Sequence, residues 1–144
     1  MLKPGDSAPD FAVNDTTLSR ILKEREVVLF FFPKAFTPGC TREAGGFRTE
    51  YASLQKQGAE VIGISSDTQA VADRFGASLE LPFPMVGDAT GDVLRAYGVR
   101  IPILGMARRV SYVIGRDGRI RHAYESQFDA QSHVTQACSV VRRA

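Results

Sequence analysis

The stretch from Glu26 to Phe32, EVVLFFF, constrains the fold of this chain more than any other. It is a continuous run of apolar, β-prone residues after a charged flank, and Pro33 closes it. A strand covered by helices on both faces of a parallel sheet has this composition. A helical pattern then begins at Pro38 and continues to about Gln57. The segment therefore predicts a central strand of an α/β sheet, followed by a helix.

Strands and helices alternate along the rest of the chain. The pair Asp117-Gly118 separates two β-prone runs and is a strong signal for a hairpin turn. Ser66 or Asp67 is expected to cap the second long helix. The expected strands lie at 60–65, 84–87, 110–114 and 119–124, and the expected helices run from that cap to about Phe75, at 90–97 and at 129–142.

This order, a strand–helix–strand unit followed by a hairpin and a terminal helix, predicts the fold class. The right-handed crossover of the first unit leaves few ways to place all strands in one sheet. We expect an α/β protein with a thioredoxin-like fold, in which helices flank both faces of a central mixed sheet. The 144 residues suit a single domain, 1–144, and the segment up to Leu22 is an addition to its core.

Composition argues against several function classes. The 18 basic and 16 acidic residues give a net charge of +2, too balanced for a nucleic-acid-binding surface. No apolar run approaches the length of a membrane-spanning helix, and segment 1–11 lacks the apolar core of a signal peptide. We therefore expect a cytoplasmic protein without membrane contact. Two widely separated cysteines and two histidines predict neither a disulfide framework nor a metal site.

The first cysteine, Cys40, lies in the sequence Thr-Pro-Gly-Cys at the start of the helix that follows the buried strand. Thr37 is a good N-cap and Pro38 suits the first helical position, so Cys40 occupies the third. Free backbone N–H groups and the helix dipole stabilise an anion there, which favours a reactive thiolate. Cys40 also begins an apolar stripe, so we expect it to be sheltered and to need a nearby cation. The stripe consists of Cys40, Ala44, Phe47, Tyr51 and Leu54.

Alternative roles for Cys40 fit the surrounding residues less well. A buried cysteine that merely starts an apolar stripe would not need Thr-Pro-Gly before it. A dithiol reductase is disfavoured because no second cysteine forms a C-x-x-C pair. A cysteine hydrolase needs a histidine base, and neither His122 nor His133 lies in a recognisable motif. The residues therefore indicate a redox nucleophile that acts as a single cysteine.

Residues 33–40, PKAFTPGC, resemble the P-x-x-x-T-x-x-C signature of the peroxiredoxins. The longer stretch 31–47, FFPKAFTPGCTREAGGF, is similar to the bacterioferritin-comigratory (peroxiredoxin Q) branch of that family. The opening GDSAPDF, VIGISSD at 61–67 and RVSYVIGRDGRI at 109–120 are similar too. The resemblance covers nearly the whole chain. It implies a protein with a thioredoxin-like fold that reduces hydrogen peroxide and organic hydroperoxides without metal, haem or flavin.

The resemblance also implies roles for particular residues. Cys40 matches the peroxidatic cysteine, which becomes a sulfenic acid, and Thr37 matches the hydroxyl that binds the peroxide. Pro33 matches the residue that shields the site from water. Arg109 matches the family arginine and would supply the cation that Cys40 needs. Glu43, in the C-x-x-E position, matches an acid that orients arginines.

Two of these assignments have alternatives. Arg108 is adjacent to Arg109, and neighbouring strand residues face opposite sides, so only one of them can reach Cys40. We favour Arg109 from its place in RVSY; otherwise it is a solvated charge at a strand end. Glu43 is otherwise an acid on the helix surface.

The chain departs from the peroxiredoxin Q pattern in its second cysteine. Gly45 occupies the position, five residues after Cys40, where many members have it, and the following helix at 68–75 also lacks one. Cys138 shares an apolar stripe of the last helix with Val134 and Val141, which favours burial over a resolving role. A one-cysteine mechanism is therefore expected, with regeneration by an external thiol.

The expected function is thus a thiol-dependent peroxidase, and thioredoxin, glutaredoxin or a small thiol is the expected reductant. The alternative is a redox sensor or binding module in which oxidation of Cys40 changes a partner contact. Either a monomer or a homodimer is compatible with the sequence.

Two further segments have open interpretations. Gly45-Gly46 inside a predicted helix either loosens its first turns or allows close packing against a neighbour. The apolar stretch from Val99 to Met106 has neither helix nor strand period. It either walls the active site, forms a buried loop or makes a dimer contact.

Overall fold

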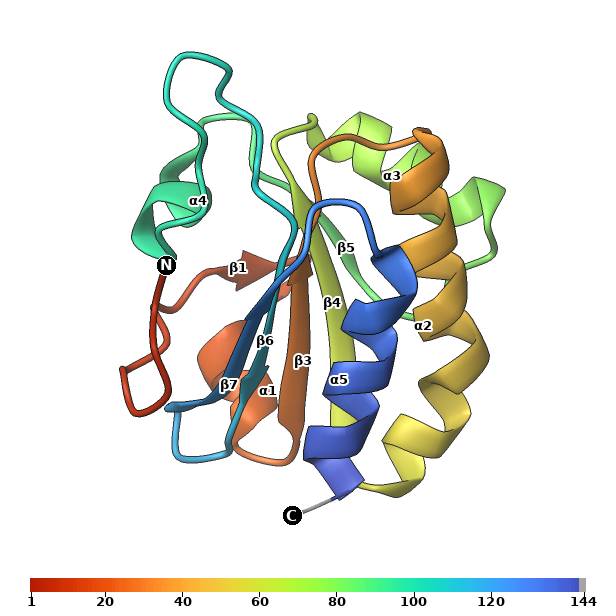
Figure 1. Ribbon diagram of the computed structural model, residues 1–144. Coiled ribbons are helices and arrows are strands. Elements are labelled where there is room, and N and C mark those ends of the chain that lie inside the picture. Colours follow the sequence, from red (N-terminus) through yellow and green to blue (C-terminus); the bar gives the residue numbers. More distant parts are fainter. Residues whose placement is uncertain (143–144) are drawn as a thin grey trace.

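The computed structural model describes residues 1–142, so the last two residues of the predicted domain 1–144 lie outside the described part. Its centre is a five-stranded sheet in the order β5-β4-β3-β6-β7 (Figure 1). β3, β4 and β5 are parallel, whereas β6 and β7 are antiparallel to their neighbours. The predicted mixed sheet is therefore confirmed. The strands are β3 (Glu26–Phe31), β4 (Ala59–Ser65), β5 (Met85–Gly87), β6 (Val110–Ile114) and β7 (Ile120–Glu125).

β3 is the middle strand because its apolar residues are buried on both faces. Leu29 pairs with Ile62 of β4 on one side and with Tyr112 of β6 on the other. Val28 and Phe30 belong to one core cluster, while Leu29 and its alternate neighbours belong to the cluster on the opposite face. The prediction from EVVLFFF is therefore confirmed, and the chain leaves β3 directly into the segment that carries Cys40.

Helices cover the two faces of the sheet unequally (Figure 1). The long helices pack on the face that contains Phe30, and the short ones, with a small antiparallel ribbon, pack on the other. No helix within residues 1–142 combines the length and the apolar character that crossing a bilayer requires. The first group consists of α2 (Pro38–Lys56), α3 (Gln69–Ser78) and α5 (Ala130–Arg142); the second of α1 (Leu18–Leu22), α4 (Asp92–Ala96), β1 (Ala12–Val13) and β2 (Thr16–Thr17).

Two sequence-based expectations about local structure are corrected. Thr68, not Ser66 or Asp67, is the N-cap of α3, and its hydroxyl accepts a hydrogen bond from the backbone N–H of Val71. Asp67 makes other contacts. Its Oδ2 accepts hydrogen bonds from the hydroxyl of Ser65 and from the backbone N–H of Ala35, in the segment that precedes Cys40. The turn at Asp117-Gly118 does connect β6 and β7 as predicted, with Gly118 at a φ of +79°.

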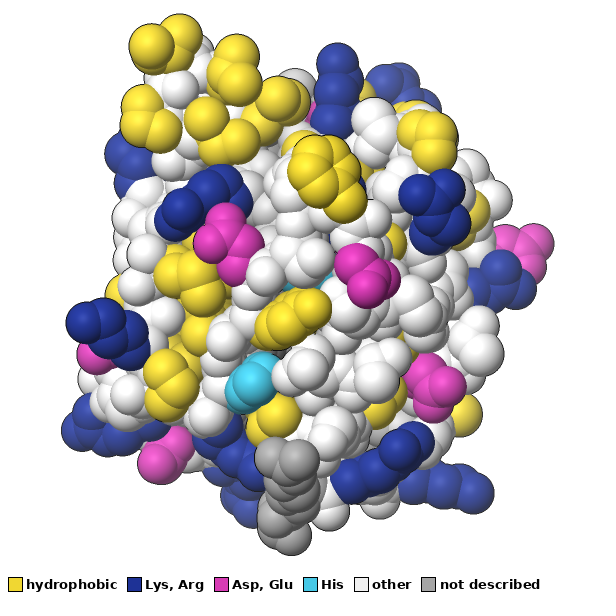
Figure 2. Space-filling view, in the orientation of Figure 1, with side chains coloured by type: hydrophobic (Ala, Val, Ile, Leu, Met, Phe, Trp, Pro, Cys, Tyr) yellow, Lys and Arg dark blue, Asp and Glu magenta, His cyan; other side chains and the backbone are white. Residues whose placement is uncertain are grey.

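The apolar loop from Val99 to Met106 projects from the molecule. Ile103 at its tip is fully exposed and Leu104 is 64% exposed, so the interpretation as a buried loop is wrong. The loop rises above α4 at the upper left in Figure 1, and Figure 2 shows hydrophobic side chains gathered there.

The two adjacent glycines of α2 have different surroundings. α2 is continuous through both. A Cβ on Gly46 would lie 2.9 Å from Cγ2 of Val134 in α5, which is closer than real contacts allow. A Cβ on Gly45 would meet nothing within 4 Å. Gly46 therefore permits the close approach of α5 to α2, whereas nothing in the packing requires Gly45.

This difference predicts opposite outcomes for one substitution at two neighbouring positions. Gly45→Ala should stabilise the protein by about 0.5–1 kcal/mol, because alanine favours the helix. At Gly46 the same gain should be offset by an overpacking cost of roughly 1–3 kcal/mol. Urea unfolding of both variants measures the difference. Equal stabilisation at the two positions would show that α5 does not depend on a glycine there.

Candidate active site

Cys40 is placed by the end of β3 and the first turn of α2. Thr37 is the N-cap, with an extended backbone, and its carbonyl accepts the first helical hydrogen bond from Thr41 at 2.9 Å. Pro38 occupies the first helical position, so Cys40 is the third helical residue, as predicted. Its side chain is only 1% exposed. The thiol therefore lies at the positive end of α2, sheltered from solvent.

Thr37 does not cap α2 with its side chain, contrary to the expectation. Its hydroxyl instead donates a hydrogen bond of 2.7 Å to the backbone carbonyl of Lys34. This contact uses the single O–H hydrogen and leaves the oxygen lone pairs free. Thr37 is thus arranged to accept a hydrogen bond from a bound molecule.

The segment between β3 and α2 is anchored to the end of β4. The backbone N–H of Ala35 donates to Oδ2 of Asp67 at 2.9 Å, and Ser65 donates to the same oxygen at 2.6 Å. The next residue, Phe36, has a φ of +66° and packs edge-on against Phe75 of α3. These contacts determine where α2 begins, and they were not predicted from the sequence. The VIGISSD stretch contains the signal, because it places polar side chains immediately after a buried strand.

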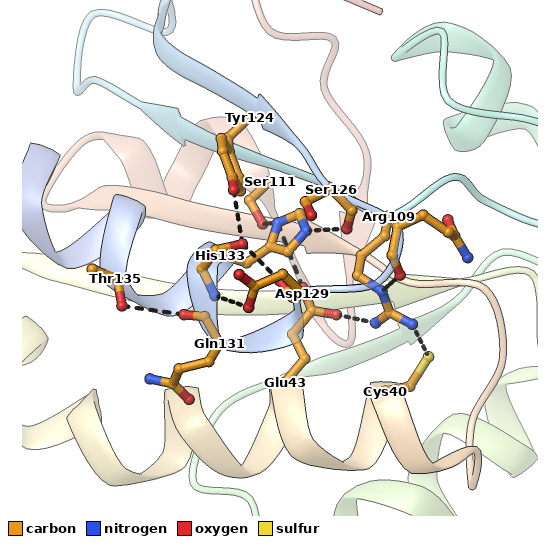
Figure 3. Close-up of polar contacts among 12 residues, drawn as sticks. Cys40, Glu43, Arg109, Ser111, Tyr124, Ser126, Asp129, Gln131, His133 and Thr135 are labelled. Carbon is orange, nitrogen blue, oxygen red and sulfur yellow. Dashed lines mark hydrogen bonds and ion pairs between the residues drawn. The ribbon is translucent and has the colours of Figure 1, made fainter.

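Arg109 brings three groups of the site together (Figure 3). Its Nη2 lies 3.3 Å from Sγ of Cys40, its Nη1 donates to Oε1 of Glu43 at 2.7 Å, and its Nε donates to the carbonyl of Gln127 at 3.0 Å. Arg109 is 5% exposed. A Cβ on Gly39 would lie 3.1 Å from Nη2, so this glycine leaves room for the guanidinium beside the thiol.

Arg108 faces the other way, as expected from the sequence, although both arginines lie just before β6. Its Nη2 donates to the carbonyl of Gly98 at 2.8 Å, and its Nε lies 3.6 Å from Glu125. The side chain is more than a third exposed. Arg108 therefore belongs to the surface, and of the two arginines only Arg109 reaches Cys40.

Glu43 is completely buried, so the interpretation as an acid on the helix surface is wrong. It lies one turn after Cys40, on the same side of α2, and both side chains meet the guanidinium of Arg109 (Figure 3). Burial raises the pKa of Glu43 to about 8, although the charge of Arg109 acts in the opposite direction. Only Oε1 of the carboxyl has a hydrogen-bond partner among the described residues.

A buried histidine, His133 of α5, lies on the far side of this carboxyl. Its Nδ1 is 2.6 Å from Oγ of Ser111 and 3.7 Å from Oε2 of Glu43, and its Nε2 is 2.8 Å from the carbonyl of Ser126. These residues were not predicted from the sequence, because they lie far apart in the chain and form no motif. Their only signal is a histidine within the apolar face of the last helix.

A cavity of about 340 Å³ opens above this cluster. Cys40 does not line the cavity, but Arg109 and several residues that precede Cys40 in the chain do. A small molecule in the cavity therefore lies close to the thiol. The loop at 99–106 is not part of this wall. A larger hollow of about 590 Å³ lies at the other end of β3, around Glu26, and contains no cysteine or histidine. The smaller cavity is lined by Pro33, Thr37, Gly39, Arg42, Arg109, Gln127 and Phe128.

Cys138 is buried on α5, away from this cavity. It borders a separate hollow beside Glu50 of α2, about 10 residues beyond Cys40, which corresponds to about 15 Å along the helix. A disulfide requires Cα atoms within about 7 Å, so the two cysteines cannot join while both helices are intact. Burial also raises the pKa of the Cys138 thiol, which keeps it in the less reactive protonated form. Residues 1–142 contain no group of three or more potential metal ligands.

Comparison with known proteins identifies the family. The model of the AhpC/TSA family matches residues 4–123. A peroxiredoxin Q of the chloroplast from rice (Oryza sativa subsp. japonica) is 35% identical over 96% of this chain, which spans 66% of the length of the rice protein. A putative peroxiredoxin from Mycobacterium tuberculosis is 35% identical over 98% of this chain and 97% of its own length.

A solved structure gives the same result. The crystal structure of the peroxidoxin BcpB from Mycobacterium tuberculosis matches 99% of this chain and 98% of its own, with a TM-score of 0.92 and 32% identity. The thioredoxin-like fold predicted from the order of strands and helices is confirmed by this match. The chain belongs to the AhpC/TSA family and is a peroxiredoxin of the Q type.

Proposed function

We propose that this protein reduces hydroperoxides at Cys40 with electrons from an external thiol. The observation that carries the proposal is the contact of 3.3 Å between Nη2 of Arg109 and Sγ of Cys40, at a helix N-terminus beside an open cavity. The guanidinium of Arg109 and the N-terminus of α2 both place positive charge beside the sulfur. The thiolate is the nucleophile that attacks peroxides.

The first step is attack of the thiolate on one peroxide oxygen. The S–O bond forms as the O–O bond breaks, so that Cys40 becomes a sulfenic acid and the other oxygen leaves as alkoxide or hydroxide, which takes up a proton. Arg109, fixed by Glu43 and Gln127, is a donor for the charge that develops on the oxygens. Thr37 accepts the hydrogen bond of the peroxide O–H, and Pro33, which has no N–H of its own, keeps the wall of the cavity free of a competing donor.

Regeneration is proposed to use one cysteine of this chain. Thioredoxin, glutaredoxin or a small thiol attacks the sulfenic acid and releases water, and a second thiol then reduces the mixed disulfide. The burial of Cys138 and its position beside Glu50 support this scheme. A cytoplasmic location remains our prediction; the rice relative is a protein of the chloroplast.

Sustained peroxide consumption with excess dithiothreitol tests the function directly. Cys40→Ser should abolish it, since a serine hydroxyl is not ionised near neutral pH. Cys138→Ala is the matched control. It should keep most of the turnover, with a modest loss of stability from the shortened side chain.

Mass spectrometry of the peroxide-treated protein, after thiols are blocked, complements this assay. It should find a sulfenic acid at Cys40 and no peptide that joins the two cysteines. A cross-linked peptide together with inactive Cys138→Ala would contradict the one-cysteine mechanism. A single stoichiometric reaction without turnover would instead favour a redox sensor.

The two arginines give a second matched pair. Arg109→Met removes a charge-assisted contact to the sulfur, worth about 1.5–3 kcal/mol, and should slow the reaction of Cys40 with peroxide by roughly 10- to 150-fold. Arg108→Met should have little effect, because its contacts are at the surface. Stopped-flow measurement of the single-turnover rate checks both. If Arg108→Met were the slower variant, the assignment of Arg109 would be wrong.

A further inference from the structure

The second carboxyl oxygen of Glu43 has no part in the reaction described above. Oε2 is buried and has no hydrogen-bond partner among the described residues, and it faces Nδ1 of His133 at 3.7 Å. Both side chains are fully buried. Buried polar groups without partners are rare and costly, so the state of this carboxyl requires an explanation.

The contacts of His133 show which of its nitrogens can change protonation. Nε2 lies 2.8 Å from the backbone carbonyl of Ser126, which can only accept, so Nε2 carries a hydrogen. Nδ1 lies between Oγ of Ser111 and Oε2 of Glu43. The space between Nδ1 and Oε2 is therefore where one additional proton can be held.

A charge count indicates when that proton is present. Cys40, Glu43, Arg109 and His133 are all at most 5% exposed. With Cys40 as thiolate, its charge and that of Arg109 cancel, and an ionised Glu43 would leave an uncompensated buried negative charge. Once Cys40 is a neutral sulfenic acid, Arg109 has no counter-charge unless Glu43 is ionised. Uncompensated buried charges are strongly disfavoured, so the two states require different protonation of Glu43.

We propose that Glu43 carries a proton on Oε2, facing His133, while Cys40 is a thiolate, and that this proton leaves when peroxide oxidises Cys40. The proposal rests on the proposed function and makes Glu43 and His133 positioning residues that act through Arg109. Thiolate, hydroperoxide and protonated Glu43 become sulfenic acid, alcohol or water, and ionised Glu43. The sulfur is oxidised by two electrons, and the peroxide is reduced by two electrons as its O–O bond breaks. The one proton that Glu43 releases balances the one proton that the leaving oxygen takes up.

The pKa values agree with this assignment. Burial raises the pKa of Glu43 to about 8, whereas burial lowers the pKa of His133, so the proton resides on the carboxyl at neutral pH. Because the pKa is raised, the carboxyl is protonated below about pH 8 and loses its proton as the pH rises through that value. The charged and titratable groups around the pair are Cys40 on α2, Arg109 before β6, Tyr124 and Glu125 on β7, and Asp129 before α5.

Proton counting in a single turnover tests the proposal. Pre-reduced protein in weak buffer at about pH 7 receives one equivalent of hydrogen peroxide, and a pH indicator reports the protons exchanged with solution. The wild type should show no net uptake. Glu43→Gln, which has no proton to release, should take up about one proton per sulfenic acid formed. Glu50→Gln makes the same chemical change elsewhere on α2 and should behave as the wild type does.

Two measurements on the wild type keep the test independent of the variants. Proton uptake should rise toward about one per turnover as the pH is raised above the pKa of Glu43, and infrared difference spectra at neutral pH should show a protonated-carboxyl band lost on oxidation. Equal proton counts in wild type and Glu43→Gln, or no such band, would overturn the proposal. Dimedone labelling of Cys40 quantifies the sulfenic acid, and its absence would contradict the proposed function instead.

Discussion

The active site depends on the guanidinium of Arg109, which donates hydrogen bonds in three directions. Arg109 contacts the thiol of Cys40, the carboxyl of Glu43 and the carbonyl of Gln127 with three different nitrogens. A planar group with several fixed donors can do this, and a single ammonium cannot. The sheet supplies the geometry, because β6 pairs with β3 and so places Arg109 beside the start of α2.

Burial strengthens these electrostatic contacts and also raises the cost of leaving any charge unpaired. Inside the protein the attraction between guanidinium and thiolate is little screened, but every charge there needs a partner. Glu43 and His133 are fully buried behind Arg109, where they have no access to solvent. This is the physical reason to expect that oxidation of Cys40 changes the protonation of a neighbour. Gly39 leaves room for the guanidinium of Arg109 and Gly46 leaves room for the side chain of Val134 in α5, and together they provide the space in which this cluster packs.

The sequence predicted the order of elements well because its signals are local. The run EVVLFFF and the pair Asp117-Gly118 each determine a structure from neighbouring residues. Alternation predicted that Arg108 and Arg109 face opposite sides, and the RVSY resemblance favoured Arg109 as the one that reaches Cys40. The caps were predicted less well: Thr37 and Asp67 have side chains suited to capping, but Thr37 bonds locally to the carbonyl of Lys34 and Asp67 accepts from the distant backbone N–H of Ala35. His133 and Ser111 were missed because only the packing of α5 on the sheet brings them to Glu43.

The most direct test of the central role of Arg109 is the single-turnover rate of Arg109→Lys with hydrogen peroxide. Lysine keeps the positive charge but lacks the planar group that reaches three partners together. We expect Arg109→Lys to react with hydrogen peroxide much more slowly than the wild type, and nearly as slowly as Arg109→Met. A rate equal to that of the wild type would show that charge alone suffices, and would contradict the account of Arg109 as a geometric link between Cys40 and Glu43.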